Sequence, residues 1–231
     1  MRRRIKASAL FPVAGPDWPR KQLIGGATGL LLELVFVGLA YFASEEAAFG
    51  IAPMAVAVNF PVIGYALQVY EGALRWDEGG LPEWDKWPRL FSDGLIGVSV
   101  AMAYSILPLF LVLIGLGLLV KGGIILFLGM VLMVLGVLAG VFTLFFLPMA
   151  LAEYLTHHRL EAAFHPTRLW GKINEILPEY VATYVLSIGL YIVAGVAAAI
   201  PYLGPIIWPF LWFYLLLVQA RLFGEICAQI A

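Results

Sequence analysis

The sequence predicts an all-α, polytopic membrane protein with six transmembrane helices that form three hairpins. Hydrophobic residues make up 62% of the 231-residue chain and charged residues only 13%. A soluble domain is about 45–50% apolar and about 25% charged. Apolar runs also recur at lengths near the ~20 residues that a helix needs to cross the hydrocarbon core. We therefore expect one integral membrane domain over residues 1–231.

Six segments are apolar enough to be predicted as spans, and short polar turns separate the members of each pair. The turns are "SEEAAFG" at 44–50, Lys121-Gly122-Gly123 and "YLGP" at 202–205. The expected helices cover 22–43, 51–70, 95–120, 122–152, 180–203 and 205–228. Two longer connections, 71–94 and 153–179, join one hairpin to the next.

The basic residues predict the orientation, because cytoplasmic loops carry an excess of Lys and Arg. The N-terminal segment 1–21 and the two long connections hold twelve of the fourteen basic residues. Only Lys121 falls on the opposite side, and Arg221, near the end of the last predicted helix, is expected on the same side as the twelve. We expect a multi-pass protein of a prokaryotic cytoplasmic (inner) membrane with both termini in the cytoplasm. The twelve residues are Arg2, Arg3, Arg4, Lys6, Arg20, Lys21, Arg75, Lys86, Arg89, Arg159, Arg168 and Lys172.

The tripeptide Trp-Pro-Arg occurs twice, each time before an apolar run. Trp favours the headgroup level, Pro fits the first helical turn, and Arg extends its charge toward phosphates. "PTRLWGKINEIL" at 166–177 is an altered third copy. Either a hairpin is repeated three times, or the anchors arose independently. The predicted interfacial anchors are Trp18, Arg20, Trp84, Trp87, Arg89, Arg168 and Trp170.

Both long connections have amphipathic stretches that predict interfacial helices on the cytoplasmic side. In 82–94, Trp84, Trp87 and Phe91 recur at helical spacing. In 160–177 apolar residues recur similarly, with Pro166 as a break. The stretches would serve membrane anchoring or, alternatively, docking of a partner.

The stretch 64–95 carries a set of features that resembles a known family. Gly64-Tyr65 lies late in a returning helix, Arg75 follows, and Leu81-Pro82-Glu83-Trp84 comes next. Phe91 then precedes Asp93-Gly94. In these features the chain resembles an uncharacterised prokaryotic membrane family, domain of unknown function 4013. The resemblance implies a polytopic helical protein and implies no activity.

Glu33 is the most informative single residue, since it lies about three helical turns past Lys21 and hence near mid-bilayer. A charge at that depth costs several kcal/mol, so such residues face the bundle interior and are paired or protonated. Asn59 and Tyr104 are expected at similar depth and complete a candidate intramembrane polar site. Two interpretations remain open: a protonated carboxyl that locks two helices, or a group used in proton coupling or cation binding.

Other candidates for chemistry are weak. Glu153, His157, Glu161 and His165 follow each other at steps of four, so His157 and Glu161 are candidate metal ligands if the helix continues. Arg221 and Glu225 are expected to form a local ion pair. The sequence has no Gly-x-Ser-x-Gly, no His-Glu-x-x-His and no cysteine cluster, so we expect no enzyme and no cofactor.

Two functions remain open. The first is a non-enzymatic scaffold or accessory subunit that binds membrane lipids and other membrane protein subunits or copies of itself. The second is a transporter of a small molecule, ion or lipid that uses Glu33 and proline-broken helices. A net charge of −1 suggests no nucleic-acid partner. A polar cavity that converges on Glu33 would favour transport, and a dry core around it would favour the scaffold.

Overall fold

The computed structural model describes residues 7–42, 57–77 and 79–230, and every regular element in these ranges is a helix. The chain divides into two compact units, although the composition predicts one membrane domain. Unit 1 comprises Met1–Gly97 and Ile173–Ala231, and unit 2 comprises Val98–Lys172.

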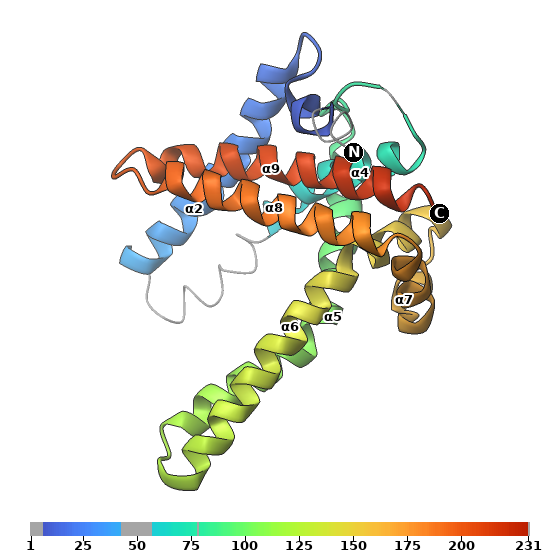
Figure 1. Ribbon diagram of the computed structural model, residues 1–231. Coiled ribbons are helices and arrows are strands. Elements are labelled where there is room, and N and C mark those ends of the chain that lie inside the picture. The colour runs from blue at the N-terminus through green and yellow to red at the C-terminus, as the bar shows by residue number, and fades with distance from the viewer. Residues whose placement is uncertain (1–6, 43–56, 78, 231) are drawn as a thin grey trace. The chain divides into compact units, whose positions relative to one another are not determined.

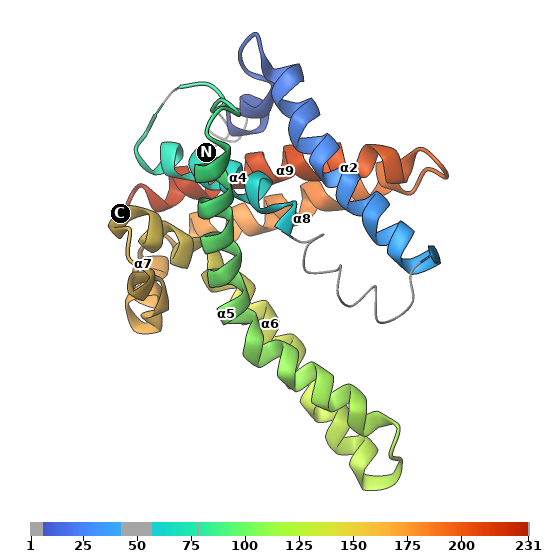
Figure 2. The same cartoon turned by 180° about the vertical axis from the view of Figure 1, so that it is seen from behind.

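Helix α9 (Gly204–Cys227) is the centre of unit 1. It packs against α2 (Trp18–Phe42), α4 (Phe60–Leu74) and α8 (Leu177–Ala198), and the short 3-10 helix η1 (Phe11–Val13) also contacts it. Both views show α8 alongside α9 (Figures 1 and 2). The core around α9 includes the fully buried side chains of Phe213, Leu217 and Val218. The most buried of the long apolar helices is thus the one that holds unit 1 together.

Two glycines allow α4 to approach the first turns of α5 (Trp87–Leu119) very closely. A Cβ atom at Gly64 would lie 1.9 Å from the Leu90 carbonyl oxygen, and one at Gly94 would lie 1.7 Å from the Phe60 carbonyl oxygen. Real Cβ atoms cannot come that near to backbone atoms, so this crossing requires glycine at both positions. Two residues of the family resemblance, Gly64 and Gly94, therefore have a direct packing role.

Unit 2 is a long apolar hairpin with a short helical segment at its base. The rest of α5 lies beside α6 (Gly123–His157), and η2 (Leu160–Phe164) packs on α6 (Figures 1 and 2). Gly115 and Gly129 face each other so closely that a Cβ on either would lie 2.8 Å from the other's carbonyl oxygen. Most large apolar side chains of the hairpin are exposed, which is the pattern expected where lipid is the solvent.

Four described helices are long and apolar enough to cross a membrane: α5, α6, α8 and α9. This supports a multi-pass membrane protein. Of the six predicted spans, 51–70 falls partly outside the described residues; the helix that overlaps its described part is α4, which has 15 residues and continues to Leu74. The prediction that Trp-Pro-Arg marks a helix start is confirmed, since α2 begins at Trp18 and α5 at Trp87, each with proline next. Both helices therefore begin before the predicted spans, which start at 22 and 95.

Two local predictions are wrong. The stretch 82–94 is not helical before Trp87, because Trp84 folds back onto α4 instead of continuing the helix. The helix expected to carry His157 and Glu161 ends at His157, where His158 adopts a left-handed conformation (φ 51°). After η2 ends at Phe164, the chain resumes a helix at Pro166 as α7 (Pro166–Glu175), so the predicted break at this proline is confirmed.

Candidate functional site

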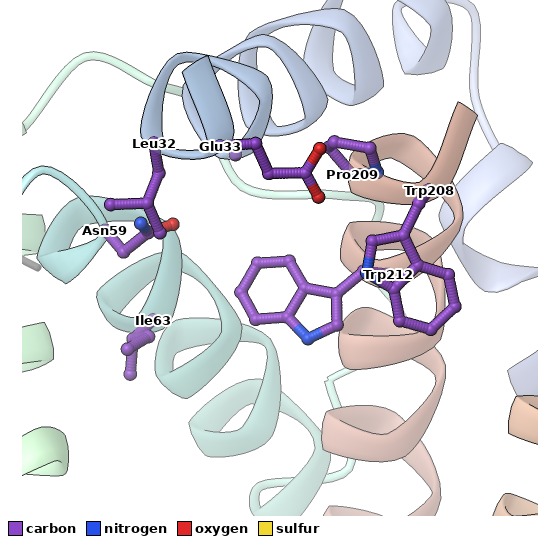
Figure 3. A pocket seen from close by; sticks show the side chains of 8 residues that line it. Leu32, Glu33, Asn59, Ile63, Trp208, Pro209 and Trp212 are labelled. Atoms are coloured by element: carbon purple, nitrogen blue, oxygen red, sulfur yellow. The ribbon is translucent and has the colours of Figure 1, made fainter. Parts of the chain in front are cut away.

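The principal candidate site is a pocket of about 300 Å³ between α2, α4 and α9, and it lies wholly within unit 1. Glu33 comes from α2, Asn59 immediately precedes α4, and Trp208 and Trp212 come from α9. Figure 3 shows the Glu33 carboxylate extending toward the α9 side chains, with Asn59 on the α4 side. Its lining comprises Gly29, Leu32, Glu33, Asn59, Ile63, Trp208, Pro209 and Trp212.

The two polar side chains of this pocket have no partner among the described residues. Asn59 is 7% exposed, yet neither its amide nitrogen nor its amide oxygen makes a hydrogen bond. Glu33 is half-buried, with no ion pair or hydrogen bond in the described part of the chain. None of the described residues that line the pocket is basic. Because buried polar groups are normally hydrogen-bonded, the unsatisfied Asn59 amide beside a carboxylate without a partner among the described residues indicates a site for a ligand.

Sequence reasoning anticipated Glu33 and Asn59 but missed the aromatic wall. Trp208 and Trp212 stand four residues apart, so they share a face of α9 around Pro209. The spacing of the two tryptophans in "IIWPFLWF" could have indicated this aromatic wall. In so apolar a helix, however, the same spacing is typical of ordinary core or lipid-facing residues. Gly29 leaves room beside Pro209, since a Cβ there would lie 3.2 Å from the Pro209 Cβ.

Tyr104, the third member of the predicted polar site, belongs to unit 2 and does not line the pocket. Its hydroxyl donates a hydrogen bond of 2.5 Å to the Ala163 carbonyl oxygen, and its ring stacks on Phe164. Thr143 of α6 donates to the Tyr104 carbonyl oxygen at 3.2 Å. Tyr104 thus fastens η2 to the hairpin.

Three of the residues that carry the family resemblance, Tyr65, Pro82 and Trp84, meet in a second cluster of unit 1. The Tyr65 ring stacks on Trp84 with centroids 4.3 Å apart and planes inclined by 11°. The Tyr65 hydroxyl donates a 2.7 Å hydrogen bond to the Pro82 carbonyl oxygen. Phe213 of α9 packs near both rings. Trp84 is consequently only 8% exposed, so it acts inside the protein and not as the interfacial anchor that we predicted.

Lys21 ties α2 to the same connection. Its ammonium group donates to the Leu81 carbonyl oxygen at 2.8 Å and lies 2.5 Å from the Glu83 carboxylate. The Lys21 side chain is 11% exposed, so these two oxygens satisfy a largely buried charge. The Leu-Pro-Glu-Trp segment is therefore bound from both sides, by α2 through Leu81 and Glu83 and by α4 through Pro82 and Trp84.

A third cluster surrounds Glu153 near the end of α6. This carboxylate is 2% exposed and lies 2.5 Å from the Lys172 ammonium group and 3.2 Å from the Arg168 guanidinium group. The His157 ring nitrogen is 3.8 Å from the same carboxylate. The cluster thus consists of one buried carboxylate and two cations of α7, so it carries one positive charge more than is needed to neutralise Glu153.

The metal candidates do not form a site. The described residues contain no group of three or more His, Cys, Asp or Glu side chains arranged to hold a metal ion. His157 and Glu161 lie on either side of the end of α6, and the Nε2 atom of His157 contacts Arg168 at 3.3 Å. The expected ion pair in α9 is confirmed: Arg221 Nε lies 2.7 Å from Glu225. Arg221 also donates to the Asp77 carbonyl oxygen.

The other predicted anchors are exposed. Trp18, Trp87 and Trp170 are 38%, 45% and 48% exposed. Arg20, Arg89 and Arg168 are exposed too. Arg89 lies 3.5 Å from Asp93 and 3.7 Å from Glu71, whereas Arg168 belongs to the Glu153 cluster.

Residues 47–203 match the family described as protein of unknown function (DUF4013). The chain belongs to this family, as the features of 64–95 indicated. The match includes Tyr65 and Trp84 of the second cluster, the whole of unit 2, and Asn59 and Ile63 of the pocket, but not Phe213 of the second cluster. Glu33 and both tryptophans of the pocket lie outside it. No curated protein and no solved structure matches the chain.

Proposed function

We propose that this protein spans a prokaryotic inner membrane six times, as three hairpins, with both termini in the cytoplasm. Four apolar helices support four of the spans. We assign a fifth to α2, which has 25 residues, and the sixth to the segment that ends in α4. The distribution of Lys and Arg supports the orientation. Exposed Leu160, Phe164 and Trp170 support contact of η2 and α7 with the membrane surface, although Leu169 and Ile173 of α7 are buried.

We propose that the protein is non-enzymatic and binds a small molecule in the Glu33 pocket, with transport of that molecule as its function. The observation that carries this proposal is that Glu33 and Asn59 face one cavity without partners in the described chain. With Lys21 at the interface, a rise of 1.5 Å per residue puts Glu33 about 18 Å deeper, within a core about 30 Å thick. In transporters, substrate sites lie near this depth, where helices are interrupted by residues such as proline. In this chain, α9 contains Pro209 beside the pocket.

Native extraction of the tagged protein followed by mass spectrometry of bound components tests this proposal. We expect a retained small molecule that is lost in Ile63→Trp, which fills the pocket. Ile188→Trp is the matched control, because Ile188 is 57% exposed on α8. A retained molecule present equally in both variants would contradict binding in the pocket.

The second candidate function is a scaffold or accessory subunit that binds lipids, other membrane proteins or a second copy of the chain. The exposed apolar hairpin of unit 2 favours it, because helices in a complex can replace lipid by packing against such faces. The same extraction distinguishes the two functions. A stoichiometric protein companion in the absence of any bound small molecule would support the scaffold and overturn the transporter.

A further inference from the structure

Among the described residues, the pocket is lined by one acidic group and no basic group, which restricts the charge of its ligand. A carboxylate in a low-dielectric environment is stable only if it is protonated or paired with a cation. Glu225 and Glu153 obtain their cations from Arg221 and Lys172 of this chain. No described residue supplies a cation to Glu33. A cationic ligand would provide the missing charge, and an anionic ligand would add a second negative charge.

The aromatic wall points to the same charge. Trp208 and Trp212 present indole rings to the cavity from α9, across from Glu33 and Asn59 (Figure 3). Among side chains, the Trp face attracts cations most strongly, and the attraction increases when water is excluded. The remaining lining is apolar apart from Asn59, so the cation must carry an apolar portion that fills the space beside Leu32 and Ile63.

Asn59 refines the chemistry of the charged group. Its amide is buried and both of its polar atoms are unsatisfied. Its carbonyl oxygen is an acceptor, so it suits a ligand with an N–H group better than a fully alkylated nitrogen. A protonated amine can donate one hydrogen to Asn59 and another to Glu33.

We propose that the pocket binds a small organic ammonium ion, a protonated amine with one apolar or aromatic group. The inference rests on the proposed small-molecule function of this pocket and specifies its ligand class. Glu33 would pair with the ammonium group, Asn59 would accept a hydrogen bond from it, and Trp208 and Trp212 would cover the apolar portion. A volume of about 300 Å³ lies at the lower end of small-molecule sites, which suits a single ring with a short chain.

The test is equilibrium dialysis of the purified chain in nonionic micelles against three probes of similar size, with protein-free micelles as the background for partitioning. The probes are protonated phenethylamine, the neutral 2-phenylethanol and the anionic phenylacetate. We expect the amine to bind at least tenfold more tightly than the alcohol, and phenylacetate not to bind. Glu33→Gln should weaken amine binding at least tenfold and leave the alcohol unchanged. Glu161→Gln, an exposed carboxylate in unit 2, should change neither.

The protection of Cys227 reports whether each variant is folded, since this thiol is 1% exposed in the same unit. Trp212→Leu should weaken amine binding about three- to tenfold through loss of the cation–ring attraction. If alcohol and amine bind equally, with or without Glu33, the pocket binds small molecules but the inference about charge is wrong. If none of the three probes binds to a folded protein, the ligand class is overturned, and a retained molecule of another class in the native extraction would still sustain the proposed function.

Discussion

Replacing Glu153 by glutamine tests the energetics of the buried cluster in unit 2. Glu153 is 2% exposed, and the Lys172 side chain that neutralises it at 2.5 Å is only 19% exposed. Removing one partner of a buried ion pair costs about 3–5 kcal/mol, because the other charge stays buried and uncompensated. Glutamine keeps one oxygen that can accept a hydrogen bond from Lys172, so we expect Glu153→Gln to lower the free energy of unfolding by about 3 kcal/mol, the lower end of that range.

Arg168 provides the internal comparison. Its side chain is 49% exposed, so it can turn toward solvent or headgroups when Glu153 is neutral. Exposed ion pairs contribute about 0–1 kcal/mol, and Arg168→Gln should therefore cost less than about 1 kcal/mol. Lys172→Met should cost about as much as Glu153→Gln, because it leaves Glu153 buried with only the exposed arginine.

The assay is an SDS titration in mixed micelles of protein with Cys227→Ser and Ala163→Cys. Ala163 is fully buried in η2, so a thiol-reactive dye should label Cys at this position only when unit 2 opens. Far-UV circular dichroism of the same samples gives a second transition. Equal costs for Glu153→Gln and Arg168→Gln, or a cost below 1 kcal/mol for Glu153→Gln, would refute the assignment of Lys172 as the essential partner.

Three further predictions concern unit 1 and the topology. Gly64→Ala should abolish monodisperse protein in size-exclusion chromatography because its Cβ would collide with the α5 backbone, whereas Gly195→Ala, with no atom within 4 Å, should leave the elution profile unchanged. Tyr65→Phe should lower the free energy of unfolding by about 1 kcal/mol, since it loses the hydrogen bond to Pro82 but keeps the stacked ring. The melting temperature is measured by labelling of the buried cysteine, Cys227, and an unchanged value would contradict this role. Alkaline phosphatase inserted after Lys121 should be active, and an inactive fusion there would refute the proposed orientation.

Helix starts and turns could be predicted from the sequence where the residues of one short segment determine the local conformation. Pro19 and Pro88 lie in the first turns of their helices, and the glycines after Lys121 form the predicted turn with positive φ at Gly122 and Gly123. The stretch 82–86 could not be predicted in the same way. Its conformation depends on Tyr65, which is distant in sequence and holds both the Pro82 carbonyl group and the Trp84 ring.

The candidate sites show the same limit. Glu33 was recognisable because a charge deep in an apolar run is costly wherever it lies. Trp208 was not, because its role depends on which face of α9 borders α2. Glu153 was noted for its spacing to His157, but its partner Lys172 follows a helix end, a 3-10 helix and a proline. Spacing predicts neighbours only within one continuous helix.

The carboxylates of the apolar segments differ in a way that bears on function. Glu225 is paired at i, i−4 with Arg221 and also accepts from Ser8 at 3.2 Å, so its charge is compensated within the fold. Glu153 is more deeply buried and has cations from α7. Each of these two groups therefore stabilises the structure that surrounds it. Glu33 has neither arrangement among the described residues, and it faces a cavity beside another unsatisfied side chain. A carboxylate that no cation of the described residues compensates is available to a ligand, which is why Glu33, rather than the better-packed Glu153, is the residue to test for binding.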